Sequence, residues 1–143
     1  MSQIQPLRIL VAEDNENDVL ILTRAFSKAA PEASVHFVRD GEEAIAYLGG
    51  VGRFADRAAY PLPGLLVVDL KMARMDGFEA IEWVRTKSDL RGMPIAVLSS
   101  SGDPCDISRA YRLGANAYHV KPQDPSELIR VVEGWKVFRR TPV

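Results

Sequence analysis

The sequence predicts an α/β fold built on a five-stranded parallel sheet. Short runs of apolar residues alternate with segments whose apolar residues recur at helical spacing, which is typical of successive β-α units. Several of these runs are unbroken, as expected for strands buried on both faces of a parallel sheet. The length of 143 residues suits one domain, which we place at residues 1–143 with its core at about residues 7–138.

The expected strands and helices follow one another in regular order. We place the strands at residues 7–12, 35–38, 65–69, 95–99 and 117–120. Helical spacing recurs at positions 19, 22, 26 and 29, at 44, 45 and 48, at 81 and 84, and at 107, 110 and 111, and a fifth helix follows the last strand. Pro94 marks a strand entrance, Gly114 a helix end and Pro125 a first helical turn. Right-handed crossovers then give a doubly wound, flavodoxin-like three-layer sandwich with strand order 2-1-3-4-5.

Composition and charge exclude several classes of function. The net charge is −1 and no basic block is present, so we expect no direct binding to nucleic acid. The N-terminus carries no charged leader, and no apolar run approaches the ~20 residues of a membrane span. We therefore expect a cytoplasmic protein with no membrane partner. Cys105 is the only cysteine, which excludes an intrachain disulfide and a thiolate metal cluster.

Acidic residues stand at the ends of the first and third expected strands. Glu13 and Asp14 follow the first strand, and Asp69 ends the third. One of the first two acids, or Asp18, could simply cap the following helix. Asp69, however, stands at the tip of an apolar strand, where an unpaired charge is costly. Because the first and third strands are neighbours in this topology, we expect Glu13, Asp14 and Asp69 to converge on one pocket.

The fourth and fifth strands deliver hydroxyls and a lysine to the same edge. Ser99 and Ser100 stand at the end of the fourth strand, and Lys121 follows the fifth, next to Pro122. The alternatives are a solvated surface lysine and serines that cap the helix beginning near Pro104. Three converging carboxylates need positive charge beyond one lysine, and oxygen ligands favour Mg²⁺. A reachable aspartate, Mg²⁺, a lysine and a hydroxyl suit the transfer of a phosphoryl group onto a carboxylate.

Four segments carry a resemblance to a known family. They are residues 9–15 (ILVAEDN), 68–77 (VDLKMARMDG), 98–100 (LSS) and 114–122 (GANAYHVKP), which fall in order at four predicted strand exits. Together they resemble the receiver domain of bacterial two-component response regulators, of which the chemotaxis regulator is a small familiar member. The resemblance spans nearly the entire chain.

The resemblance implies a phosphoryl acceptor and a metal site. Asp69 would be phosphorylated by a partner histidine kinase. Asp14 and Asp69 would ligate Mg²⁺ directly, Glu13 would act through water, and Lys71 would contribute its backbone carbonyl.

The resemblance also implies a conformational switch. Lys121 would bind the phosphoryl oxygens, Ser99 would take the place of the usual threonine, and Tyr118 would be the aromatic switch beside it. The alternative for Tyr118 is a core aromatic residue that packs without moving. Phosphorylation would bias the surface formed by the fourth helix, fifth strand and fifth helix.

The fifth helix carries more apolar surface than one core stripe requires. Leu128, Val132 and Trp135 form that stripe, and the arc is widened by Ile129, Val131 and Phe138, with Val137 on the opposite side. Either deep burial of the helix, or homodimerisation or kinase docking through it, would explain the excess. Residues 139–143 are too few for an effector domain, so we expect no output domain and a downstream protein partner.

The sequence departs from the family pattern at three places. Ala73 replaces a common proline, which predicts a looser loop after Asp69, and Gln123 replaces a frequent aromatic residue. The stretch from Gly49 to Gly64 is longer than typical connections in α/β units. This insertion is similar to those of single-domain regulators that serve phytochrome-type and hybrid sensor kinases.

Other functions of the same topology fit less well. A mononucleotide-binding protein needs a phosphate loop where the acidic turn at residues 13–16 would repel phosphate, and a dehalogenase-type phosphatase needs a second aspartate where Lys71 stands. His36 and His119 lie within strands, so histidine-based hydrolysis is weakly supported. A degenerate receiver that acts as an unphosphorylated scaffold remains the alternative function.

Overall fold

Five parallel strands form the centre of the protein. The computed structural model describes residues 6–138, and the segment 139–143, for which we expect no effector, lies outside the described residues, as does the N-terminal segment 1–5. The strands are β1 (Arg8–Ala12), β2 (Ser34–Val38), β3 (Leu65–Val68), β4 (Ile95–Ser99) and β5 (Ala117–Val120). They lie in the order β2-β1-β3-β4-β5, which confirms the predicted topology.

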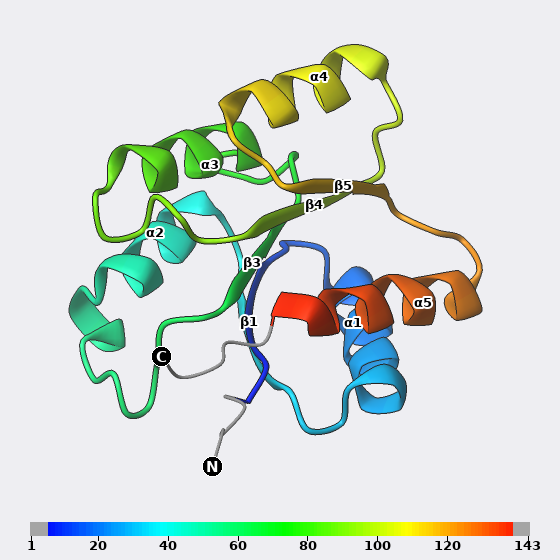
Figure 1. Ribbon diagram of the computed structural model, residues 1–143, viewed down its shortest axis with the longest axis horizontal. Coiled ribbons are helices and arrows are strands. Elements are labelled where there is room, and N and C mark those ends of the chain that lie inside the picture. Colours follow the sequence, from blue (N-terminus) through cyan, green and yellow to red (C-terminus); the bar gives the residue numbers. More distant parts are fainter. Residues whose placement is uncertain (1–5, 139–143) are drawn as a thin grey trace.

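The helices cover both faces of the sheet. They are α1 (Glu16–Ala29), α2 (Gly41–Gly49), α3 (Gly77–Thr86), α4 (Pro104–Leu113) and α5 (Pro125–Trp135), with short 3-10 turns η1 (Gly52–Phe54) and η2 (Lys136–Phe138). Figure 1 shows α1 and α5 on one face and α2, α3 and α4 on the other. The three-layer arrangement is therefore as expected. Among the described residues, no helix combines the length and apolar character needed to cross a membrane.

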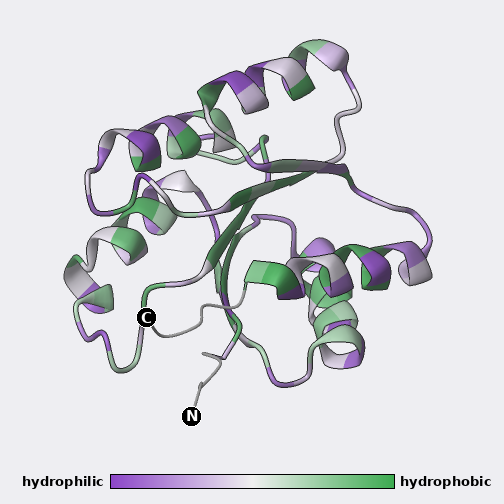
Figure 2. Cartoon of the chain, viewed as in Figure 1, coloured by the Kyte–Doolittle hydropathy of each residue, from purple (hydrophilic) through white to green (hydrophobic). Residues whose placement is uncertain are grey.

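Two hydrophobic clusters hold the layers together, one on each face of the sheet. Successive residues of a strand point to opposite faces. In β1, Ile9 and Val11 join the cluster under α1 and α5, whereas Leu10 and Ala12 join the one under α2, α3 and α4. The three central strands, β1, β3 and β4, are mostly green in the hydropathy colouring of Figure 2, because both of their faces are buried. This explains why the sequence shows unbroken apolar runs.

The parallel register brings the strand ends level with one another. Ala12, the last residue of β1, pairs with Val68, the last residue of β3. The next residue along, Asp69, donates its backbone N–H to the carbonyl of Ala12 at 3.1 Å. On the other side, Ser99 pairs with Val120 of β5, and the N–H of Lys121 bonds to the carbonyl of Ser99 at 2.7 Å. The residues after each strand therefore meet at one edge of the sheet.

The strand limits differ from the predicted ones at three ends. The first strand begins at Arg8 and the second at Ser34, and β3 ends at Val68, so Asp69 lies just beyond it. After Asp69 the chain turns sharply, because the N–H of Gly77 bonds to the carbonyl of Leu70 at 3.1 Å and closes the loop before α3. The predicted punctuation is observed, with Gly114 at the end of α4 and a φ of 120° there.

The Gly49–Gly64 insertion is folded onto the end of α2. Arg57 donates hydrogen bonds to the carbonyls of Tyr47 and Leu48, both at 2.7 Å. The rings of Tyr47, Phe54 and Tyr60 pack against one another at centroid distances between 5.2 and 5.8 Å. His36 of β2 contacts two of these rings, which accounts for this histidine by packing. The guanidinium thus supplies donors to carbonyls at the end of α2, one of which, that of Tyr47, also accepts the N–H of Gly50 at 3.1 Å.

The fifth helix buries the stripe predicted for it. Leu128, Val132 and Trp135 are all buried against the α1 side of the sheet. The residues that widen this stripe are partly buried against the same cluster; they are Ile129, Val131 and Phe138. Part of the wide apolar arc is thus used within the chain, while Val137 is exposed. His119 lies edge-on to Trp135, which accounts for the second histidine by packing.

We predict that Gly77→Ala destabilises the fold by about 1–3 kcal/mol through overpacking. A Cβ at this position would lie 2.4 Å from the backbone carbonyl oxygen of Asp69, where no flexible side chain can yield. Urea denaturation measures the loss. Gly134→Ala in α5 is the control, since nothing lies within 4 Å of the added Cβ, and it should leave stability unchanged or raise it by up to about 1 kcal/mol. Equal effects of the two substitutions would contradict this account of the turn.

Candidate functional site

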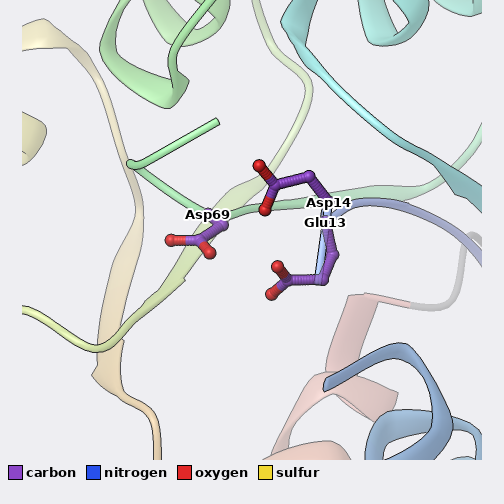
Figure 3. A group of neighbouring side chains, drawn as sticks. All are labelled: Glu13, Asp14 and Asp69. Carbon is purple, nitrogen blue, oxygen red and sulfur yellow. The ribbon is translucent and has the colours of Figure 1, made fainter. Parts of the chain in front are cut away.

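Three carboxylates meet where β1 and β3 end. Glu13, Asp14 and Asp69 each offer an oxygen atom within 4.8 Å of the others (Figure 3). Glu13 and Asp69 are buried, with only 3% and 6% of their surface exposed, whereas Asp14 is exposed. The register described above causes this convergence, because Glu13 and Asp69 each follow a residue of the paired strand ends. The structure thus brings together the three acids that the sequence singled out.

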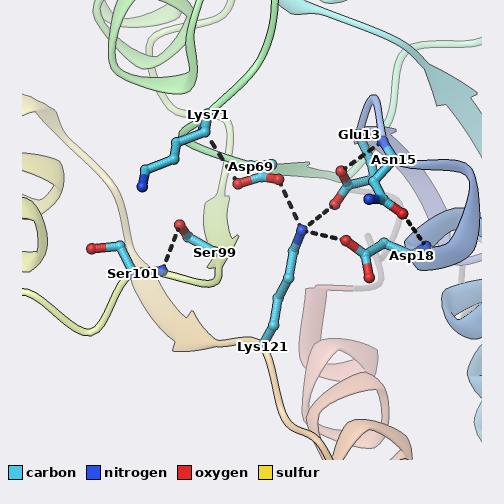
Figure 4. Close-up of polar contacts among 8 residues, drawn as sticks. All are labelled: Glu13, Asn15, Asp18, Asp69, Lys71, Ser99, Ser101 and Lys121. Carbon is cyan, nitrogen blue, oxygen red and sulfur yellow. Dashed lines mark hydrogen bonds and ion pairs between the residues drawn. The ribbon is translucent and has the colours of Figure 1, made fainter.

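The ammonium of Lys121 lies among these acids and one more. Its Nζ lies 2.7 Å from Glu13 Oε1 and 2.9 Å from Asp69 Oδ2. It also lies 2.7 Å from Asp18 Oδ2, which comes from the first turn of α1 (Figure 4). Lys121 is therefore held by acids from three elements, and the solvated surface lysine considered from the sequence is not observed.

Asp18 is the residue of this group that sequence reasoning missed. We considered it only as a possible cap of α1. The structure assigns the cap to Asn15, whose side-chain oxygen accepts the N–H of Asp18 at 3.0 Å. A signal was available, because an asparagine three residues before an acid already satisfies the helix end and leaves that acid for other contacts.

The acids and the lysine perturb one another. Burial, opposed by the hydrogen bond from Lys121 and reinforced by the charge of Asp69, raises the pKa of Glu13 to about 7. Burial also opposes the charged form of Lys121, but hydrogen bonds to Asp18, Glu13 and Asp69 outweigh it and raise the pKa of the ammonium. The lysine therefore stays charged, while the crowded acids favour binding a proton or another cation.

The donor set fits a hard divalent cation. Carboxylate oxygens are the ligands that Mg²⁺ prefers. Three carboxylates contact the ammonium and Asp14 lies beside two of them, so the site keeps negative charge that a cation can offset. One of the three clustered acids, Asp14, is exposed, so solvent can reach the group. The loop after Asp69 folds back on this acid, since Lys71 N–H lies 3.3 Å from Asp69 Oδ1. The carbonyl of Lys71 as a metal ligand stays a prediction.

Ser99 is buried at the end of β4, on the side of the site away from β1. Its hydroxyl oxygen accepts the N–H of Ser101 at 3.2 Å. Ser100, which we expected to share the site, is exposed, and no hydrogen bond among residues 6–138 joins its side chain to the acids. The second serine in the network is Ser101 instead, and its hydroxyl donates to Asp106 of α4 at 2.6 Å.

Tyr118 is joined to the same loop. Its hydroxyl donates to the carbonyl of Ser101 at 2.7 Å, and its ring packs against the core under α2, α3 and α4. Ser101 therefore connects the buried hydroxyl of Ser99, the ring of Tyr118 and the first turn of α4. Packing of Tyr118 against the core is observed, and its role as a switch stays a prediction.

The loop between β3 and α3 is tied to the start of α2. Arg74 has a φ of 64°, and its Nε atom lies 3.1 Å from Oδ2 of buried Asp40. The N–H of Gly41 bonds to the carbonyl of Met75 at 2.9 Å. These contacts hold the segment around Ala73, where the sequence lacks the proline that would restrict it.

Comparisons with known proteins agree with this geometry. The family model described as response regulator receiver domain matches residues 9–133. The probable methanogenesis regulatory protein FilR2 of Methanothrix harundinacea is 31% identical, over 96% of this chain and 88% of the relative. Response regulator Rcp1 of Synechocystis is 28% identical over 93% of this chain and 88% of its own, and its Mn²⁺-bound structure has a TM-score of 0.80.

Two further solved structures resemble the chain over almost all of its length. Response regulator RPA3017, from red light signaling of R. palustris, has a TM-score of 0.87 at 35% identity. The phosphorylated cyanobacterial phytochrome response regulator RcpA has a TM-score of 0.85 at 31% identity. Each comparison covers 96% of this chain and 99% of the other.

We predict a pH dependence of stability that is specific to Glu13. Because the folded state binds the Glu13 proton more tightly than the unfolded state, ionisation of this residue costs stability as the pH rises from about 4.5 to about 7. With divalent ions chelated, the free energy of unfolding of the wild type should fall relative to Glu13→Gln by on the order of 2–3 kcal/mol across this interval. Urea denaturation at several pH values measures the difference.

Glu16→Gln is the control for this experiment. Glu16 is an exposed acid in the adjacent first turn of α1, and Glu16→Gln keeps Glu13, so this variant should lose stability relative to Glu13→Gln as the wild type does. A wild-type stability that rises relative to Glu13→Gln over the same interval would contradict the raised pKa.

Proposed function

This chain belongs to the response regulator receiver domain family, and on that premise we propose that it accepts a phosphoryl group on Asp69 from a sensor histidine kinase in a Mg²⁺-dependent reaction. The observation that carries the proposal is the meeting of Asp69, two further acids and the ammonium of Lys121 at one edge of the sheet. The protein would act as a cytoplasmic signalling switch in a two-component phosphorelay.

The proposed reaction is a displacement at phosphorus. A carboxylate oxygen of Asp69 attacks the phosphorus atom of the donor phosphohistidine, a P–O bond forms, and the P–N bond breaks. The bonding electrons return to the imidazole nitrogen of the kinase. Phosphoryl transfer of this kind depends on positioning and on charge neutralisation more than on further covalent chemistry. Asp69 is buried but reached by the loop N–H of Lys71 and the ammonium of Lys121, which hold its two oxygens in place.

Positive charge is the other requirement of the transfer. Glu13, Asp14, Asp69 and the carbonyl of Lys71 would hold Mg²⁺, which supplies charge neutralisation for the phosphoryl oxygens when bound. The ammonium of Lys121 provides the second positive group, and it already donates to Asp69 at 2.9 Å. Because Asp14 is exposed, the phosphohistidine of the kinase would reach the site from this side.

The switch would begin at the hydroxyl of Ser99. The phosphoryl group adds acceptor oxygens beside this hydroxyl, which would turn to donate to them. Its present bond with the N–H of Ser101 would then weaken, and the loop that carries Ser101 would move. Because Tyr118 and Asp106 both bond to Ser101, this movement would reach β5 and α4 together.

The surface of α4, β5 and α5 is the proposed output. It would contact a downstream protein or a second copy of the chain, and it carries exposed Tyr111 of α4 and Val120 of β5. We place the input in a phytochrome-type kinase. This rests on the similarity to RcpA and RPA3017 over 96% of the chain and on the Gly49–Gly64 insertion.

We predict that the purified protein gains the mass of one phosphoryl group when mixed with Mg²⁺ and acetyl phosphate. Asp69→Asn should show no gain, because an amide oxygen is a far weaker nucleophile than a carboxylate, and chelation of Mg²⁺ should abolish the gain in the wild type. Intact-protein mass spectrometry measures these products. Absence of labelling in the wild type would favour the unphosphorylated scaffold, and equal labelling of Asp69→Asn would place the acceptor elsewhere.

The kinase assignment has its own test. We predict that an autophosphorylated bacterial phytochrome kinase transfers its phosphoryl group to this chain faster than a chemotaxis kinase does, at least about tenfold, which corresponds to ~1.4 kcal/mol of discrimination. The transfer rate is measured from the loss of radiolabel from each kinase. Asp69→Asn is the control for spontaneous hydrolysis of the phosphorylated kinase. Equal rates from the two kinases would contradict the phytochrome-type input and leave the acceptor site untouched.

A further inference from the structure

The contact between Asp18 and Lys121 is a feature that the proposed chemistry does not itself require. It joins the first turn of α1 to the residue after β5, and the two residues are 103 positions apart in the chain. At 2.7 Å it is as short as the contact between Lys121 and Glu13. Figure 4 shows Asp18 approaching the ammonium from the side opposite Ser99.

The position of Asp18 in its helix makes this contact informative. In both α2 and α3 the third residue after the cap is a glutamate whose carboxylate reaches back to the backbone at the helix start. Glu43 accepts the N–H of Arg39 at 2.7 Å, and Glu79 accepts the N–H of Asp76 at 3.4 Å. An acid at this position is ordinarily explained by such capping.

The first helix is capped without the carboxylate of Asp18. The N–H of its cap residue, Asn15, bonds to Glu13 Oε2 at 3.1 Å, so the group that an acid at the third position normally serves is already satisfied. The carboxylate of Asp18 therefore has no role in closing the helix start, and it contacts the ammonium of Lys121 instead. The structure uses a capping position for a contact within the site.

Asp18 also differs from the other two partners of Lys121. Glu13 and Asp69 belong to the cluster whose oxygens lie within 4.8 Å of one another, and Asp18 does not. An ammonium has three N–H donors, and its three partners here are the three carboxylates. When a cation and a phosphoryl group engage Glu13 and Asp69, Asp18 is the partner that remains to hold the lysine.

We propose that Asp18 is a positioning residue for the phosphoryl-transfer site: its carboxylate accepts one N–H of Lys121 and directs the other two toward Asp69 and the incoming phosphoryl oxygens. This inference rests on the proposed function. A lysine side chain loses considerable rotamer freedom when it is fixed, and a partner that fixes it beforehand removes that cost from the transfer step. Asp18 suits this task because its side chain comes from a helical turn and lies at the outer side of the site, where 30% of it is exposed. The side chain of Lys121, which it holds, is 18% exposed.

The test compares two neutral replacements at the same position. Asp18→Asn keeps an acceptor oxygen on the side chain, and Asp18→Ala removes it, so the pair separates hydrogen bonding from charge. At saturating Mg²⁺ and acetyl phosphate, we expect the phosphorylation rate of Asp18→Ala to fall about five- to tenfold. This fall corresponds to part of the energy of one charge-assisted hydrogen bond. Asp18→Asn should recover to within about twofold of the wild type.

Glu16→Ala is the matched control, because it removes the same charge from the same turn of α1. Its phosphorylation rate should stay within about twofold of the wild type. The Mg²⁺ affinities of Asp18→Asn and Asp18→Ala, measured by calorimetry, should agree with each other, since neither variant alters an acid of the cluster. A change confined to folding would instead lower the thermal stability and the Mg²⁺ affinity of both variants together.

The outcomes separate this inference from the proposed function. A wild-type rate in Asp18→Ala, a faster rate, or an Asp18→Asn variant as slow as Asp18→Ala would overturn the positioning role while Asp69 labelling in the wild type stays intact. Failure of the wild type to label, or labelling of Asp69→Asn, would instead overturn the proposed function itself.

Discussion

The site depends on the ion pairs between the ammonium of Lys121 and the carboxylates around it. The ammonium is shared by carboxylates that follow β1, begin α1 and follow β3, and without it these acids would repel one another in a largely buried space. A lysine at the end of β5 can reach them because parallel strands end at one edge, and its own backbone is bonded to Ser99. One side chain thus makes an otherwise unfavourable cluster of acids compatible with folding.

The site is connected to the surface of the protein in two directions. Toward α1, the contact with Asp18 passes through the capped first turn of that helix. Toward α4, the path runs from Ser99 through Ser101 to Asp106 and Tyr118. Hydrogen bonds therefore extend from the site on both sides, through Lys121 to Asp18 and through Ser101 to α4 and β5. Such bonds have discrete alternatives, which is the physical requirement for a switch between two states.

The packing of the sheet makes most of the fold predictable from local sequence. The unbroken apolar runs of β1, β3 and β4 are unbroken because helices cover both faces, so burial on two sides is written in the residues themselves. The predicted end of β3 is one residue too late, since Asp69 lies beyond the strand although its N–H still bonds to the carbonyl of Ala12. The folded state of the insertion, with Arg57 closing the end of α2, was not predicted because its contacts join residues about ten positions apart in a segment with no periodic pattern.

By itself the sequence determined the order of strands and helices, the layer arrangement, and the convergence of Glu13, Asp14, Asp69 and Lys121, because these follow from hydrophobic pattern and from the rule that parallel strands end together. Only the tertiary structure decided that Asp18 binds Lys121 and that Ser101 rather than Ser100 joins the network of Ser99. The reason is that an acid in a first helical turn and a serine in a loop each have several possible hydrogen-bond partners, which the neighbouring sequence does not distinguish. The choice among them depends on side-chain distances across the fold, which no spacing along the chain encodes.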